Sequence, residues 1–261
     1  RRLSDATLVR AKHDYDSVIN HQEHPTSPEQ ITKISQKVDG IIACHSEVFH
    51  ADIISRLGPH FKIIANQSVV TDHCDLAGLR ADNIAVTNTS DVLSDAAGEI
   101  ALLLMLGAAR RAFEGDCLVR SGEWDFWSPA FMVGKQVTGQ RLGIVGMGRV
   151  GRVMARNARG LNMDIHYHNQ RRLPPALEQG ATYHSTLESL LPVADFLSLH
   201  CPATDKTNGM MNRDRLATMP DGAVLINCAR GTLVDEAALL QALGSGKLAA
   251  AGLDCFADEP G

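Results

Sequence analysis

The sequence predicts an α/β protein with two lobes, each built on a parallel sheet. Short apolar runs alternate with amphipathic segments along nearly the whole chain, which is the pattern of repeated strand–helix units. One of these runs leads into a glycine-rich turn, "GMGRVG" at 146–151, that opens a helical pattern. The length of 261 residues is enough for two domains.

The first lobe is predicted to cover residues 1–90. Its elements are strands at 39–44, 61–66 and 84–88, with helices between them at 50–57 and 75–80. The chain opens on a helix-like segment without an initiator methionine, and it stops soon after a strand. We therefore expect both ends to be truncated.

The second lobe is predicted to cover residues 91–261. It begins with a long linking helix at 94–114, with Ser94 or Asp95 as N-cap. An irregular arm at 121–139 follows, with two tryptophans, glycines and a proline. The remaining predicted strands are 141–145, 163–168, 181–184, 195–200, 222–228 and 248–254.

Composition excludes several classes of protein. The charge balance of 25 Lys and Arg against 30 Asp and Glu gives a net charge of −5, which offers no electrostatic basis for binding nucleic acid or an anionic membrane. The longest apolar stretch, 100–109, is about half the length that a bilayer span needs. Six cysteines without metal or disulfide spacing, and no signal-peptide pattern, predict a cytoplasmic protein.

The glycine turn has the context of a dinucleotide-binding motif. In G-x-G-x-x-G, Gly146 permits the tight turn, Gly148 lets the backbone approach a pyrophosphate, and Gly151 lets helix and strand pack closely. The N–H groups at the start of the following helix are then available to the phosphates.

The end of the next strand predicts which dinucleotide binds. A protein that binds NAD usually has an acidic residue here for the ribose 2′-hydroxyl. This chain has Asn169 instead, followed by Gln170, Arg171 and Arg172. Guanidinium groups bind a 2′-phosphate, so the segment favours NADP(H), with NAD(H) possible. The alternative is that the arginines form only a solvated turn.

Three charged residues are predicted to converge at the carboxyl edge of the second sheet, where ligands of doubly wound sheets bind. Arg230 follows one strand and precedes Gly231, Asp254 ends the next strand, and Glu259 lies just beyond.

Six segments together resemble the D-isomer-specific 2-hydroxyacid dehydrogenases. They are "ANQSVVTDHCDL" (65–76), "VTNTSDVLSDAAGEIALLLMLGAARR" (86–111), "GMGRVG", "HCPATDKT" (200–207), "INCARGTLVDEAAL" (226–239) and "AAAGLDCFADEP" (249–260). The arm "GEWDFWSP" together with "YHNQRR" looks most like the NADPH-preferring glyoxylate/hydroxypyruvate reductase branch. The resemblance implies a Rossmann nucleotide domain and a flavodoxin-like α/β substrate domain.

The resemblance also implies roles for the charged residues. Arg230 would bind the substrate carboxylate, polarise the keto oxygen and contact the cofactor. Glu259 would raise the pKa of a catalytic histidine, which is expected beyond residue 261, and Asp254 would bind the nicotinamide carboxamide. These roles make Arg230 and Glu259 the expected catalytic pair.

Further binding residues are implied by the same resemblance. The backbone of Val69 and Val70 and the arm residue Trp127 would contact substrate, Trp127 in a neighbouring subunit. Besides Gly146, Gly151, Arg230 and Asp254, the expected cofactor residues are Gly148, Arg149, Val150, Asn169, Gln170, Arg171, Arg172, Cys201, Pro202, Thr207 and Cys228. The family usually has glycine at the position of Val70, so a side chain there is a departure.

The histidines within the chain are interpreted as structural. His200 ends a strand but lies in a segment that matches a cofactor-contacting stretch, and His73 is expected to be a structural hydrogen-bonding residue. His166 and His168 have no evident carboxylate or cysteine partners for a metal, and hydride transfer needs no metal.

The expected function is NADPH-dependent reduction of glyoxylate, hydroxypyruvate or a similar 2-keto acid to the D-2-hydroxy acid. The alternatives are an NAD-dependent relative such as D-lactate, phosphoglycerate, formate or phosphite dehydrogenase, a nucleotide-sensing protein of the corepressor kind with little turnover, or a fragment that binds cofactor only. The arm and the Ala/Gly-rich helix predict a homodimer.

Overall fold

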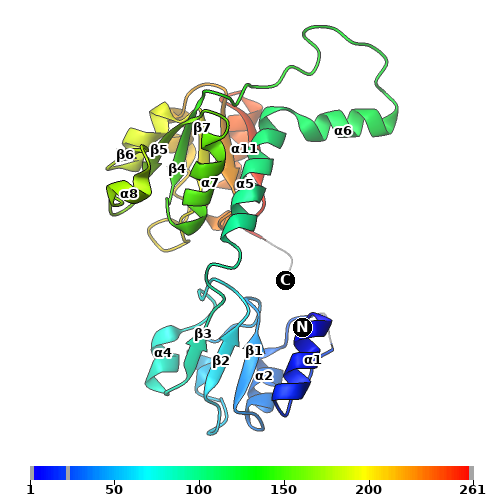
Figure 1. The fold of residues 1–261 in the computed structure, drawn as a ribbon, viewed down its shortest axis with the longest axis vertical. Helices are drawn as coiled ribbons and strands as arrows, with labels where there is room; N and C mark the ends of the chain where they lie inside the picture. The colour runs from blue at the N-terminus through cyan, green and yellow to red at the C-terminus, as the bar shows by residue number, and fades with distance from the viewer. Residues whose placement is uncertain (1–2, 22–23, 259–261) are drawn as a thin grey trace. The chain divides into compact units, whose positions relative to one another are not determined.

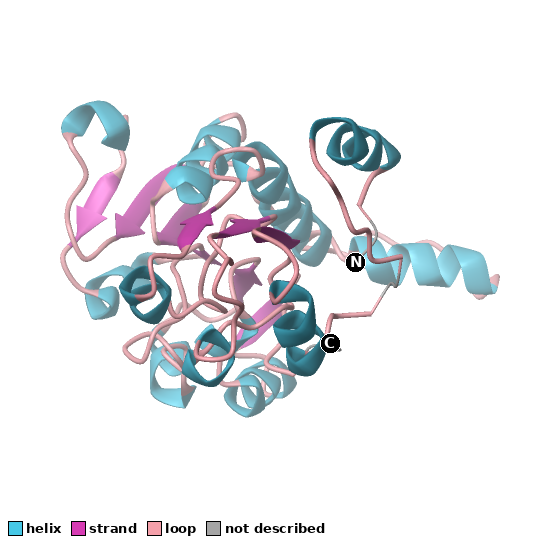
Figure 2. Cartoon of the chain, turned by 90° about the horizontal axis from the view of Figure 1, so that it is seen from below, coloured by secondary structure: helices cyan, strands magenta, loops and turns pink. Residues whose placement is uncertain are grey.

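The computed structural model describes residues 3–21 and 24–258. The chain divides between Val92 and Leu93 into two compact units, each with its own parallel sheet and core (Figure 1). Figure 2 shows the helices, strands and loops of the chain. None of the helices in the described ranges has the length and apolar character that crossing a bilayer requires.

The first unit contains a three-stranded sheet in the order β1-β2-β3, with all pairs parallel. Its elements are α1 (Asp5–Asp14), α2 (Pro28–Ser35), β1 (Gly40–Ala43), α3 (Ala51–Ile54), β2 (Ile63–Asn66), α4 (Leu76–Ala81) and β3 (Ala85–Thr87). The three predicted strands and the two predicted helices between them are confirmed, with shorter bounds except for α4, which is shifted by one residue. Phe49, Ile64 and Leu79 are fully buried in the core of this unit.

The second unit contains a six-stranded parallel sheet in the order β6-β5-β4-β7-β8-β9. Its strands are β4 (Arg141–Val145), β5 (Asp164–His168), β6 (Thr182–His184), β7 (Phe196–Leu199), β8 (Ala223–Asn227) and β9 (Leu248–Leu253). Every predicted strand of the second lobe is present, within one residue at either end. Renumbered from β4, the order is that of the doubly wound dinucleotide fold.

Helices cover both faces of this sheet (Figure 1). The helices of this unit are α5 (Ser94–Ala109), α6 (Ala112–Ser121), α7 (Arg149–Arg159), α8 (Pro175–Glu178), α9 (Leu187–Leu190), α10 (Arg213–Thr218) and α11 (Glu236–Gly244). Of these, α6 projects away from the sheet (Figure 1). Small residues let α5 lie close to its neighbours. A Cβ on Gly98 would lie 2.3 Å from Val153 of α7, and one on Gly252 of β9 would lie 2.9 Å from Leu104 of α5.

The predicted linking helix 94–114 is wrong as a single helix. It ends at Ala109, and a second helix begins at Ala112 after Arg111, which has a left-handed φ of 55°. The cause is the returning chain: the Lys135 N–H donates to the Ala109 carbonyl at 2.7 Å, and Gly134 packs so closely there that a Cβ would lie 2.4 Å from the same oxygen. The predicted N-cap is also wrong, because Leu93 occupies that position and no side chain caps α5.

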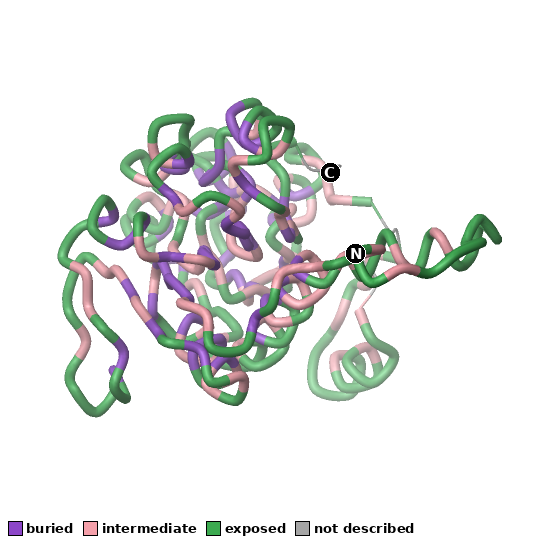
Figure 3. The backbone as a smooth tube through the Cα atoms, turned by 90° about the horizontal axis from the view of Figure 1, so that it is seen from above, coloured by how far each residue is buried: buried purple, intermediate pink, exposed green. Residues whose placement is uncertain are grey.

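Residues 111–133 form a segment that leaves and returns at the backbone contact between Ala109 and Lys135, and we call it the arm excursion. It consists of α6 and an irregular stretch, which confirms the predicted arm from Gly122 onward. None of its residues is buried, as Figure 3 shows. Its exposed large apolar side chains are Phe113, Val119, Trp124, Phe126, Trp127 and Val133.

Candidate active site

In the glycine turn after β4, backbone segments lie too close together for side chains to fit between them. Gly146 has a φ of +92°, and a Cβ there would lie 2.6 Å from the backbone nitrogen of Cys201, in the loop after β7. On Gly151 a Cβ would lie 2.4 Å from the Gly146 carbonyl oxygen. These two glycines therefore allow the first turn of α7 to lie against the end of β4, as the motif requires.

The start of α7 is open. Gly148 is the N-cap, so no side chain caps the helix, and a Cβ on Gly148 would meet nothing within 4 Å. Arg149 and Val150 form the first turn. Positive helix-end potential and backbone N–H groups without a side-chain cap suit the pyrophosphate of a dinucleotide. The residues present therefore fit this part of the cofactor.

The segment after β5 divides into residues with different partners. Asn169 accepts a hydrogen bond at Oδ1 from the Met147 N–H (2.7 Å), which ties the end of β5 to the glycine turn. Arg172 is held in a two-point ion pair by Glu178 (2.8 and 3.1 Å), and Glu178 also accepts from the Tyr167 hydroxyl. Arg172 lowers the pKa of Glu178, so this pair stays ionised. By contrast, Arg171 makes no hydrogen bond or ion pair with a described residue.

A pocket of about 720 Å³ lies beside the glycine turn, between the segments that follow β5 and β7. Gly146, Asn169, Gln170, Arg171, Cys201, Pro202 and Thr207, all expected cofactor residues, line it. Arg172 is absent from its lining. The volume and the position at the carboxyl edge fit the adenosine half of a dinucleotide.

The pocket wall after β7 is an ordered loop. The Thr207 hydroxyl donates to the Pro202 carbonyl (2.8 Å) and accepts from the Thr204 N–H (2.8 Å). Burial raises the pKa of the Cys201 thiol to about 11. Thr207 thus shapes the loop, and Cys201 presents a neutral thiol to the pocket.

Arg230 is positioned by a buried asparagine at the end of β8. Asn227, which is 1% exposed, donates from Nδ2 to the Arg230 carbonyl (2.8 Å) and accepts at Oδ1 from the Ala229 N–H (3.0 Å). The half-buried Arg230 side chain donates from Nη1 to the Ala229 carbonyl at 2.7 Å. This turn places a guanidinium at the carboxyl edge of the sheet.

Asp254 lies next to that turn. Its N–H donates to the Asn227 carbonyl (2.9 Å), and its carboxylate is exposed. Burial, and to a smaller extent the nearby Cys255 and Asp254, raise the pKa of the Cys228 thiol to about 12. A Cβ on Gly231 would lie 1.9 Å from the carbonyl carbon of Phe256, so glycine is required where this segment crosses the Arg230 turn.

The structure therefore brings Arg230, Asp254 and Cys228 together at one edge of the second unit, near the end of β8. The Ala257 N–H donates to Glu236 (2.8 Å), which fixes the chain up to this point. Glu259 lies outside the described residues, so its expected role stays a prediction.

Comparison with known proteins identifies the family. Residues 102–261 match the D-isomer specific 2-hydroxyacid dehydrogenase, NAD binding domain. A glycerate dehydrogenase from Hyphomicrobium methylovorum is 36% identical over 99% of this chain and 81% of its own length. A glyoxylate reductase from Thermococcus kodakarensis is 38% identical over 100% of this chain and 79% of its own length.

The chain belongs to the D-isomer specific 2-hydroxyacid dehydrogenase family. It is therefore an NAD(P)-dependent oxidoreductase. A putative D-isomer specific 2-hydroxyacid dehydrogenase from Polaromonas sp. JS6 66 has the same fold, with a TM-score of 0.94 and 44% identity over 100% of this chain and 82% of that one. The two parallel sheets, of three and six strands, are thus those of a 2-hydroxyacid dehydrogenase.

In this 2-hydroxyacid dehydrogenase the Val69–Val70 loop belongs to the first unit. Two asparagines hold it: Asn66 donates to the Val70 carbonyl (2.6 Å), and Asn88 donates to the Val69 carbonyl (2.9 Å). The Val70 N–H already donates to Ser68 Oγ at 3.3 Å, so a substrate carboxylate would have to replace that acceptor. Neither asparagine was expected to have this role from the sequence.

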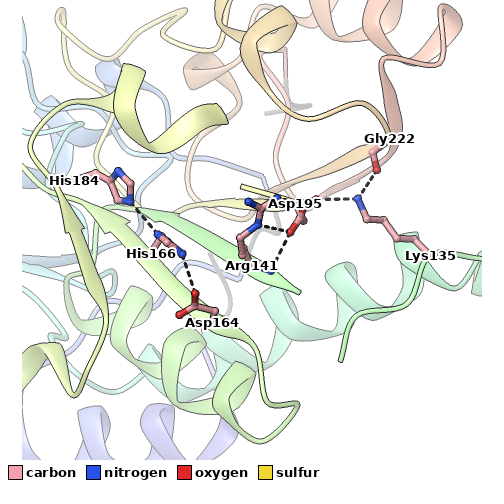
Figure 4. Close-up of polar contacts among 7 residues, drawn as sticks. All are labelled: Lys135, Arg141, Asp164, His166, His184, Asp195 and Gly222. Carbon is pink, nitrogen blue, oxygen red and sulfur yellow. Dashed lines mark hydrogen bonds and ion pairs between the residues drawn. The ribbon is translucent and has the colours of Figure 1, made fainter. Parts of the chain in front are cut away.

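Trp127 lies in the arm excursion and is 73% exposed. The excursion returns to the amino edge of the second sheet. There Lys135 donates to the Gly222 carbonyl (2.7 Å) beside the Arg141–Asp195 ion pair (Figure 4). Arg230 and Asp254 lie at the opposite, carboxyl edge, so the second unit does not bring Trp127 to its own Arg230.

The histidines of the dehydrogenase differ in part from expectation. His200 bonds Ser198 Oγ (2.8 Å) and approaches the Cys228 thiol (3.6 Å), and burial lowers its pKa to about 4. His73 is a buried structural residue as expected, and its carbonyl accepts a hydrogen bond from the Phe49 N–H (2.8 Å). Its ring nitrogens have no hydrogen-bond partner in the described ranges, and the Asp72 carboxylate lies 3.7 Å from Nδ1.

His166 does have the carboxylate partner that the sequence did not reveal. It contacts Asp164 at 3.1 Å and His184 at 2.9 Å, as Figure 4 shows. Among the described residues, no three His, Cys, Asp or Glu side chains form a group that could hold a metal ion.

Proposed function

We propose that this dehydrogenase reduces glyoxylate, hydroxypyruvate or a similar small 2-keto acid to the D-2-hydroxy acid with NADPH. The convergence of Arg230 and Asp254 beside a glycine turn that fits a dinucleotide supports the reaction. Relatives named glyoxylate reductase and glycerate dehydrogenase support the substrate class.

The choice of cofactor rests on the single observation that Arg171 lines the adenosine pocket and makes no hydrogen bond or ion pair with a described residue, where an amide, Asn169, stands in place of an acid. Arg171 would bind the 2′-phosphate by charge-assisted hydrogen bonds. Arg172 contributes to folding through Glu178 in this scheme, which narrows the sequence prediction to one arginine.

The nicotinamide, when bound, supplies the hydride that the keto carbon receives. Arg230 binds the substrate carboxylate and stabilises negative charge on the keto oxygen. Asp254 accepts from the carboxamide and so sets which ring face meets the substrate. Glu259 pairs with the histidine that protonates the oxygen. Val69 and Val70 hold the substrate carboxylate from the first unit, which serves as a flavodoxin-like substrate domain, and the second unit serves as the Rossmann nucleotide domain.

The protein is proposed to be a cytoplasmic homodimer. The arm excursion carries six large exposed apolar side chains on a base closed by Ala109 and Lys135, which suits contact with a second copy. Trp127 would then reach the partner's substrate.

Replacing Arg230 tests the reaction. Arg230→Gln is expected to lower kcat/KM for glyoxylate by about 10²- to 10³-fold, because one preorganised donor to the developing oxyanion is lost. NADPH binding, measured by fluorescence, should weaken much less than kcat/KM, because Arg230 is one of many expected cofactor contacts. Arg213→Gln, at an exposed arginine of α10, is the matched control. Unchanged kcat/KM in Arg230→Gln would contradict the assignment.

The same assay distinguishes a reductase from a nucleotide-sensing protein. A nucleotide-sensing protein would bind NADPH yet turn over none of the 2-keto acids tested.

A further inference from the structure

The adenosine pocket contains a second cation that the sequence motifs do not assign. Lys206 lines the same pocket as Arg171 and, like Arg171, makes no hydrogen bond or ion pair with a described residue. Arg171 follows β5 and Lys206 follows β7, and these strands flank β4 in the sheet. The two cations therefore come from the loops on either side of the glycine turn.

The other charges of the pocket compensate one another. Arg215 donates to Glu188 Oε1 at 2.7 and 3.2 Å, and its remaining Nη1 donates to the Met210 carbonyl (2.9 Å). Arg215 lowers the pKa of Glu188, so this pair is ionised and contributes no net charge. Arg171 and Lys206 remain as two positive charges whose counterion the described chain does not supply.

Lys206 is also held on an ordered loop. Besides the two bonds of the Thr207 hydroxyl, the Asn208 N–H donates to the Thr204 carbonyl (2.9 Å) and the Gly209 N–H donates to the Thr232 carbonyl (2.7 Å). The backbone that carries Lys206 is thus fixed before a ligand binds, which reduces the entropy lost when the ammonium group engages an anion.

We propose that Lys206 is a specificity-determining residue that supplies the second positive charge to the 2′-phosphate of the adenosine ribose. This inference rests on the proposed use of NADPH. A phosphate monoester carries up to two negative charges, which two cations neutralise, whereas the ribose of NAD has only a hydroxyl at this place. Lys206 therefore favours NADPH over NADH, because it attracts the 2′-phosphate that only NADPH carries.

Binding of two nucleotides tests the proposal without turnover. Calorimetry on the protein compares 2′,5′-ADP, which carries the 2′-phosphate, with 5′-AMP, which differs from it only in lacking that phosphate. Lys206→Gln is expected to weaken the binding of 2′,5′-ADP about tenfold, because a charge-assisted contact is lost, and to leave the affinity for 5′-AMP within about twofold. Lys206→Arg, which keeps the charge, should retain most of the affinity for 2′,5′-ADP.

The control is Lys247→Gln, because Lys247 pairs with Asp221 at the amino edge of the sheet, away from the pocket. It should leave both affinities unchanged.

Each other outcome has a distinct meaning. If the wild-type protein prefers 2′,5′-ADP and Lys206→Gln keeps that preference, the role of Lys206 is overturned while the use of NADPH stands. If the variant weakens both nucleotides equally, Lys206 contacts the shared adenosine part and the proposal fails. If the wild-type protein binds both nucleotides alike, the proposed use of NADPH fails first.

Discussion

Arg171 and Arg172 show what sequence can and cannot tell at the scale of one residue. Two adjacent arginines after β5 look equivalent in the sequence, and both were predicted to bind a ribose phosphate. The structure separates them because Glu178, six residues further on, holds Arg172 together with the buried Tyr167 hydroxyl. That pairing depends on how α8 folds back, which local composition does not reveal.

His200 shows a second residue-scale effect, a dependence of stability on pH. Burial keeps the folded pKa of His200 at about 4, against 6.5 in the unfolded chain. Below pH 6.5 the His200 ring binds a proton in the unfolded chain but stays neutral in the folded protein. The free energy of unfolding therefore decreases as pH falls from 6.5 towards 4. The loss approaches about 3 kcal/mol for this one residue.

Urea unfolding of the wild-type protein and of His200→Gln checks this prediction. The difference between their free energies of unfolding should change by a few kcal/mol between about pH 7 and about pH 4. A parallel pH dependence of the two proteins would contradict it, as would an NMR titration of the His200 ring near its ordinary pKa.

Strands were easier to predict than helices at the scale of elements. Strands buried on both faces, such as β7 and β8, are nearly continuous apolar runs bounded by polar turns, and their predicted bounds are within one residue of those observed. The break between α5 and α6 was missed because Arg110 and Arg111 are not helix-breaking residues. It arises from a tertiary contact, the return of Gly134 and Lys135 to Ala109, that no local signal reports.

The packing of α7 on β4 depends on the absence of a side chain at Gly151. In Gly151→Ala the new Cβ would meet the Gly146 carbonyl oxygen at 2.4 Å, so helix and turn must separate. We expect destabilisation by about 1–3 kcal/mol and weakened NADPH binding. Gly244→Ala in α11 is the control, because its Cβ meets nothing within 4 Å. Thermal unfolding and fluorescence titration measure both effects, and equal behaviour of the two variants would refute this view of the turn.

The whole molecule consists of two units with separate cores, and this organisation was readable from the order of strand-like runs. The hydrogen-bond partners that hold each site residue could not be predicted from the sequence. Asn227 for Arg230, and Asn66 with Asn88 for the Val69–Val70 loop, act across loops or neighbouring strands. Polar residues at strand ends are the signal that would have pointed to them.

The exposed apolar side chains of the arm excursion predict that the protein associates with a second copy of itself. If the arm excursion contacts a second copy, replacing Trp127 and Phe113 by serine should weaken the dimer about tenfold or more, since buried aromatic residues dominate such interfaces. Leu240→Ser is the control, because Leu240 of α11 is equally exposed, at 70%, but lies outside the excursion. Sedimentation velocity gives the dissociation constants. A wild-type monomer at all concentrations would disprove the dimer.

Whether Arg171 directs this dehydrogenase to NADPH is measured by the ratio of kcat/KM with NADPH to kcat/KM with NADH, both determined with glyoxylate. We expect a ratio well above one in the wild-type protein, a fall of this ratio by about tenfold or more in Arg171→Ala, and little change in Arg172→Ala. A wild-type ratio at or below one, or an unchanged ratio in Arg171→Ala, would contradict it.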